Sequence, residues 1–220
     1  MATAAAEAAK READMEAFFT GVGAKDRSSI EKHLAAVDAQ PHPAHGQLWR
    51  RLAVSLRKLA PMPVQTVGQH AVQFYIADGK YRMQVFALED AKDGRLRIYL
   101  PDVSADAVKA GLLSKPVAPA PARRASSVAA GPVGGTTGTD AAAPAADHGR
   151  EYGVKGAKGE SLRLESLDAN NTPNPAPHVK HMLGWNRKAL AITLLTNATP
   201  DQVSAAESLC ALAAKKWVKS

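Results

Sequence analysis

Residues 116–149 constrain the fold of this chain most, because they cannot contribute to a hydrophobic core. Of these 34 residues, 26 are Ala, Pro, Gly, Ser or Thr, and none is Leu, Ile, Met, Phe, Tyr or Trp. Such a segment buries too little apolar surface to offset the entropy cost of ordering it. We therefore predict a flexible linker at 116–149, and the rest of the chain must supply the folded part.

Upstream of this linker, the sequence predicts helices followed by strands. Alanine-rich residues 3–19 favour a helix, and Ser28-Ser29-Ile30-Glu31 matches a capping box that would open a second helix. Leucines 48, 52, 56 and 59 place an apolar stripe along a third helix at 46–60. Strands are predicted at 72–77, 81–89 and 95–100, and Asp78-Gly79 is a typical hairpin turn between the first two.

Downstream of the linker, we predict a strand at 162–167, a short helical turn near 178–183 and an apolar strand at 188–195. Thr199-Pro200-Asp201-Gln202 has the residues of a helix start, and this last helix should run to about Trp217. Two strands and one helix are too few for an independent core at this size.

The arrangement that covers both sets of strands is one α+β domain formed by residues 26–115 and 150–220. It would contain N-terminal helices, an antiparallel sheet of about five strands interrupted by the disordered linker, and a C-terminal helix packed on the sheet. The alternative is two separate small domains. Residues 1–25 form an alanine-rich helix that either packs on the domain or is only loosely attached.

Charge and cysteine content restrict the class of protein. The formal net charge is +7 and is spread along the chain, so an anionic partner is allowed but not required. The N-terminus lacks a basic stretch followed by an apolar one, which favours a cytoplasmic protein. No apolar run could span a membrane, and the single Cys210 excludes an internal disulfide.

Aromatic and basic residues supply the candidate binding sites. Trp185, Arg187 and Lys188 lie beside the most apolar strand, where Trp and Arg could form a recognition surface for a protein. The structural alternative is that Trp185 closes over the edge of the sheet. The other candidate binding residues are basic and lie in the helix at 46–60: Arg50, Arg51, Arg57 and Lys58. Together with Arg187, Lys188, Lys215 and Lys216, they would have to share one face to bind single-stranded nucleic acid.

The sequence offers few candidate residues for metal binding or catalysis. His42 and His45, and likewise His178 and His181, are spaced i, i+3, which puts both rings on one face if the segment is helical. His178 and His181 are therefore weak metal candidates, but we predict no metal and no cofactor. Glu89, Asp90 and Asp93 are explained by turn chemistry, and Cys210 is expected to be an inert buried thiol.

The sequence therefore favours a non-catalytic protein-interaction or regulatory module whose partner is unknown. Single-stranded nucleic-acid binding is the first alternative. A small enzyme with a pocket between the sheet and the helices is the second.

Overall fold

The computed structural model describes residues 2–39, 43–68, 70–78, 80–91, 94–114, 149–170, 175–186 and 188–218. Within these ranges, seven strands form one antiparallel sheet in the order β1-β2-β3-β4-β7-β6-β5. The strands are β1 Met62–Val67, β2 Ala71–Asp78, β3 Tyr81–Asp90, β4 Leu96–Pro101, β5 Gly149–Gly153, β6 Ser161–Asp168 and β7 Lys188–Leu194. The predicted α+β class with an antiparallel sheet is confirmed.

The sheet joins strands from both sides of residues 115–148 through one central pairing. β4 pairs with β7 in antiparallel register from Leu96↔Leu194 to Pro101↔Ala189. The structure has two more strands than we predicted, β1 and β5, and both lie at the edges of the sheet. Gly149, predicted to end the linker, begins β5, and the rest of the predicted linker lies outside the described residues.

Six helices accompany the sheet in the described part of the chain: α1 Ala2–Phe19, α2 Ala24–Asp38, α3 Pro43–Leu59, α4 Ser104–Lys109, α5 Pro177–Asn186 and α6 Pro200–Val218. The predicted start of α6 is confirmed, because Gln202 N donates to Thr199 Oγ1 and Thr199 N donates to Gln202 Oε1. The predicted capping box at Ser28 is wrong. α2 already begins at Ala24, after an extended Gly23, so Ser28 lies inside the helix.

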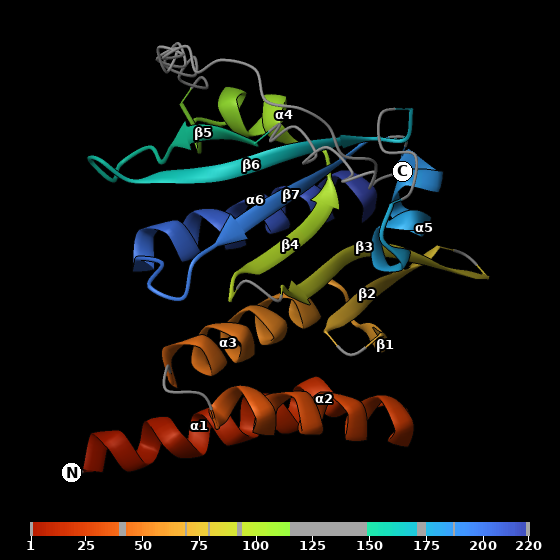
Figure 1. Ribbon diagram of the computed structural model, residues 1–220, viewed down its shortest axis with the longest axis vertical. Coiled ribbons are helices and arrows are strands. Elements are labelled where there is room, and N and C mark those ends of the chain that lie inside the picture. Colours follow the sequence, from red (N-terminus) through yellow and green to blue (C-terminus); the bar gives the residue numbers. More distant parts are fainter. Residues whose placement is uncertain are drawn as a thin grey trace, which may run out of the picture.

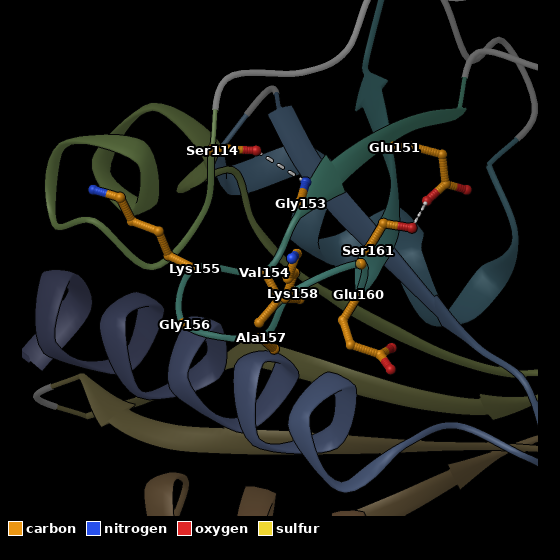
Figure 2. A pocket seen from close by; sticks show the side chains of 11 residues that line it. Ser114, Glu151, Gly153, Val154, Lys155, Gly156, Ala157, Lys158, Glu160 and Ser161 are labelled. Carbon is orange, nitrogen blue, oxygen red and sulfur yellow. Dashed lines mark hydrogen bonds between the residues drawn. The ribbon is translucent and has the colours of Figure 1, made fainter.

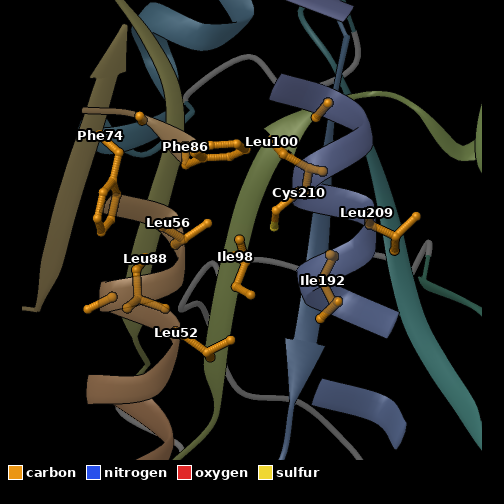
Figure 3. Packing of buried hydrophobic residues seen from close by; sticks show 14 of the residues in the cluster. Leu52, Leu56, Phe74, Phe86, Leu88, Ile98, Leu100, Ile192, Leu209 and Cys210 are labelled. Atoms are coloured by element: carbon orange, nitrogen blue, oxygen red, sulfur yellow. The ribbon is translucent and has the colours of Figure 1, made fainter. Parts of the chain in front are cut away.

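The helices cover the two faces of the sheet unequally (Figure 1). α3 and α6 pack on one face, with α1 and α2 on the far side of α3, whereas α5 packs on the opposite face. Figure 3 shows Leu52 and Leu56 of α3 and Leu209 of α6 among side chains of the central strands. Trp49 is 1% exposed, which confirms its predicted place in the core.

Candidate functional site

The outer side of α3 forms the floor of a surface groove with a volume of about 510 Å³. The inner side of α3 carries Trp49, Leu52, Ala53 and Leu56, all of them buried in the core. The groove is lined instead by α3 residues that recur every three or four positions on its opposite side, which include Gln47, Leu48, Arg51, Val54, Ser55 and Lys58. α1 and the first turns of α6 form the two walls, through Arg11, Asp14, Met15, Pro200, Val203 and Glu207.

An ion pair links α3 to α6 across one side of the groove. Arg51 Nη2 donates to Glu207 Oε2 at 2.8 Å and Arg51 Nε donates to Glu207 Oε1 at 3.1 Å. Ser55 Oγ donates to the same carboxylate at 2.8 Å. Partial burial raises the pKa of Glu207, but the hydrogen bonds from Arg51 and Ser55 outweigh it and the net pKa is lowered. The carboxylate of Glu207 therefore stays charged in the folded protein.

Two further ion pairs border the groove. Arg50 Nη1 donates to Asp38 Oδ1 at 2.9 Å, and this hydrogen bond lowers the pKa of Asp38. Lys58 Nζ lies 3.4 Å from Asp14 Oδ1, which links α3 to α1. The structure thus brings Arg50, Arg51 and Lys58, three of the predicted binding residues, to one groove.

Arg57, the fourth basic residue of α3 that we predicted to bind a partner, lies away from that groove and is hydrogen-bonded to the main chain. Its guanidinium donates to the carbonyl oxygens of Phe18 at 3.3 Å, Thr20 at 2.8 Å and Ala60 at 3.4 Å, and also to that of Met62. Burial lowers the pKa of Arg57. Carbonyl oxygens at the end of a helix lack partners within it, so Arg57 satisfies groups at the ends of α1 and α3.

Asp90 is the centre of a polar cluster between α2, α3 and β3. His45 Nε2 lies 3.0 Å from Asp90 Oδ1, and His33 Nε2 lies 3.2 Å from Asp90 Oδ2. The side chains of His33 and Asp90 are each 11% exposed and that of His45 is 3% exposed. Burial alone would raise the pKa of Asp90, but the two histidines outweigh it and the net pKa is lowered.

Glu89, the neighbouring residue of β3, belongs to a separate cluster under α5. Tyr99 Oη donates to Glu89 Oε2 at 2.5 Å, and His178 Nε2 lies 3.6 Å from the same oxygen. The carbonyl oxygen of His178 accepts hydrogen bonds from the buried amides of Gln73 and Gln84. Burial raises the pKa of Glu89, but His178 and Tyr99 outweigh it and the net pKa is lowered.

These two clusters correct the interpretation of Glu89 and Asp90 as residues explained by turn chemistry. Consecutive residues of a strand face opposite sides of a sheet, so Glu89 meets α5 while Asp90 meets α2 and α3. His45 and His178 are 2% and 6% exposed. They therefore lie on opposite faces and do not form one site. His42 lies outside the described residues.

The remaining predicted site residues lie around α5 and β7. Trp185 and His181 belong to α5, and Lys188 is the exposed first residue of β7, opposite Asp168 in register. Arg187 lies outside the described residues. Cys210 is buried in the core, as expected, and burial raises the pKa of its thiol.

A second hollow of about 570 Å³ lies at the turn between β5 and β6 (Figure 2). Gly156 and Gly159, which have φ angles of +92° and +85°, shape this turn. Its charged lining is mixed, because Glu151 and Glu160 accompany Lys155 and Lys158. In Figure 2 the side chains of Lys155 and Glu160 point away from each other. This divergence makes the hollow a weaker candidate than the groove along α3.

A third hollow, of about 290 Å³, lies on the sheet face that also carries α5. Thr193 of β7 pairs with Arg97 of β4 on one side and Arg163 of β6 on the other, so the three side chains share a face. Arg163, Thr193, Arg95 and Leu195 line the hollow, and Leu195 is 53% exposed. This face therefore combines arginines with an exposed apolar side chain.

Among the described residues, no group of three or more His, Cys, Asp or Glu side chains is arranged to hold a metal ion. No helix in the same part of the chain is both long enough and apolar enough to cross a bilayer. Comparison with protein-family models, curated proteins and solved structures found no match.

Proposed function

We propose that the protein is a non-catalytic interaction module that docks a segment of a partner protein in the groove along α3. The observation that carries this proposal is the combination of an apolar floor and a charged rim in one groove between three helices. Leu48 and Val54 on this floor and Met15 on the α1 wall are only partly buried against the core. Covering their remaining apolar surface would contribute favourable free energy on binding.

The ion pairs along the rim support the same proposal. Arg51, Glu207 and Lys58 have side chains that are 49%, 25% and 69% exposed. Ion pairs this exposed contribute only about 0–1 kcal/mol to stability, because water competes for both partners. A polar group of a docked segment can therefore take over one of these hydrogen bonds at little cost to the fold, which gives the groove a means of selecting its partner.

A photo-crosslinker inside the groove tests this function in cells that express the protein. We expect p-benzoylphenylalanine in place of the exposed Gln47, a groove residue, to give discrete crosslinked species with another protein. Adding Val54→Glu should reduce their yield about tenfold, because a charge in the apolar floor loses hydration when a partner covers it. The same crosslinker in place of Lys109, exposed on α4, is the matched control.

Two outcomes would contradict the function. One is equal crosslinking from the positions of Gln47 and Lys109. The other is a yield at Gln47 that Val54→Glu leaves unchanged. Ser204→Glu, an exposed position on α6 outside the groove lining, controls for added charge, and thermal unfolding of each variant controls for folding.

The second candidate function is single-stranded nucleic-acid binding, which the arginines at the third hollow, on the sheet face that carries α5, favour. Arg97 and Arg163 flank Thr193 on that face, and Arg95 lines the hollow beside them. Binding through this face predicts that the affinity for a fluorescent single-stranded oligonucleotide falls steeply with salt, because phosphate contacts release counterions. Arg163→Gln should weaken binding about tenfold at low salt, whereas Arg150→Gln, on the edge strand β5, should not. No change in anisotropy at low salt would exclude this candidate.

A further inference from the structure

We infer that Asp26 blocks the outer edge of β1 against pairing with β1 of a second copy of the chain. β1 and β5 are the two edge strands of the seven-stranded sheet. An edge strand presents unpaired main-chain donors and acceptors, with which a strand of another molecule can pair. The β1 edge is separate from the groove along α3, so the outcome does not depend on the proposed function.

Asp26 lies in the first turn of α2 and binds Thr66 of β1 twice. Thr66 N donates to Asp26 Oδ1 at 2.8 Å, and Thr66 Oγ1 donates to the same oxygen at 2.6 Å. In the register of the sheet, Thr66 is opposite Val72 of β2. Alternate residues of an antiparallel pair direct their main-chain groups away from the partner strand. Because the N–H of Thr66 binds Asp26 and not β2, Thr66 is such a residue and marks the open side of β1.

The first half of β1 is unsuited to strand pairing for other reasons. Pro63 has no N–H, and it lies at a register shift between β1 and β2. The carbonyl oxygen of Met62 accepts a hydrogen bond from Arg57, and that of Pro63 accepts one from Arg82 at 2.6 Å. The half around Thr66 is therefore the part of β1 that suits pairing with another strand.

The opposite edge of the sheet is covered in a different way, by a segment of the chain that runs beside the end of β5. Ser114 N donates to Gly153 O at 2.9 Å, and Gly153 N donates to Ser114 Oγ at 3.1 Å. Leu113 and Val154 form a β-bridge next to this pair. At β1 the cover of Thr66 N is a single side chain, so one substitution can remove it.

A second copy of the chain fits this edge because two identical strands can pair across a two-fold axis. In an antiparallel pair centred on Thr66, each Thr66 N–H would donate to the Thr66 carbonyl oxygen of the other molecule. Such pairing would join two seven-stranded sheets into one continuous sheet. Asp26 competes with it for the same N–H and, being part of the same chain, is always at hand.

Sedimentation velocity of the full-length protein over a range of concentrations tests the inference. Asp26→Ala leaves the N–H of Thr66 without its acceptor, so we expect self-association at a concentration at least about tenfold lower than for the wild type. Asp26→Asn is the matched control, because its amide oxygen still accepts from Thr66 and the variant should sediment like the wild type. Adding Thr66→Pro to Asp26→Ala removes the donor itself and should restore wild-type sedimentation.

Three results would overturn the inference in protein that is folded by circular dichroism. The first is self-association of Asp26→Ala no stronger than that of the wild type. The second is equal association of Asp26→Asn, which would make the charge and not the hydrogen bond responsible. The third is association that Thr66→Pro leaves unchanged, which would place the contact elsewhere. If Asp26→Ala does not fold, Asp26→Ser takes its place under the same outcomes, because the shorter serine side chain cannot reach Thr66 N.

Discussion

Replacing Asp90 by alanine is expected to lower the free energy of unfolding by about 3 kcal/mol, measured by urea denaturation at pH 7. The substitution removes the carboxylate that both His33 and His45 contact, at 3.2 and 3.0 Å, and leaves two largely buried imidazoles without it. It also removes the link that holds α2 and α3 against the end of β3. Asp106→Ala is the matched control, because Asp106 forms an exposed ion pair with Lys216, and it should change stability little.

The same carboxylate should make the protein sensitive to acid. The pKa of Asp90 is lower in the folded protein than in the unfolded chain, where it is about 3.9. Its contribution to stability is therefore complete above about pH 4 and is lost as the pH falls through the folded value. Asp90→Asn should flatten the decline in stability between about pH 4 and pH 2. A decline as steep as that of the wild type would mean that other carboxylates, such as Glu89, dominate.

Arg57→Gln is expected to destabilise the fold by about 2–3 kcal/mol while leaving crosslinking from the position of Gln47 intact in the fraction that remains folded. The loss arises because main-chain oxygens of Phe18, Thr20, Ala60 and Met62 lose a charged donor. Arg50→Gln should instead affect binding more than stability, because Arg50 lines the groove and its ion pair with Asp38 lies at the surface.

Comparing these two variants separates a structural arginine from a binding one. Arg50→Gln should cost little stability but reduce the yield of crosslinks from the position of Gln47 about fivefold. Denaturation curves of the purified variants measure stability, and crosslink yields in cells measure binding. A normal denaturation curve for Arg57→Gln, together with weakened binding, would reverse the assignment and make Arg57 part of the binding surface.

Much of the fold could be predicted from local sequence patterns. The positions of Leu52 and Leu56 in the leucine stripe predicted the buried side of α3, whereas Leu48 of the same stripe is only partly buried and lines the groove. Thr199 with Gln202 predicted the start of α6. The two strands that were missed are edge strands with weak local signals. β1 contains Pro63, which an edge strand tolerates, and β5 begins and ends with glycine.

The polar clusters could not be predicted, because their members are distant in sequence. Asp90 and His45 are 45 residues apart, and no local pattern shows that α3 brings them together. The spacing of His42 and His45 suggested a pair, whereas the structure joins His45 to His33 through Asp90. Similarly, the basic residues of α3 look equivalent in the sequence. In the structure, Arg50 and Arg51 line the groove, whereas Arg57 is hydrogen-bonded to main-chain oxygens.

The points where the chain leaves the sheet before residue 115 and returns after residue 148 lie close together. Ser114 N donates to Gly153 O at 2.9 Å, and Gly149 is at the other end of the same short strand, about 13 Å away. A handful of residues would bridge that distance, so the geometry of the sheet does not determine how long the intervening chain must be. Doubling the length of such a connection costs only about 0.6 kcal/mol in closure entropy. This position is therefore an insertion point, where related proteins can gain or lose sequence, or even a whole domain, without any strand changing its neighbours.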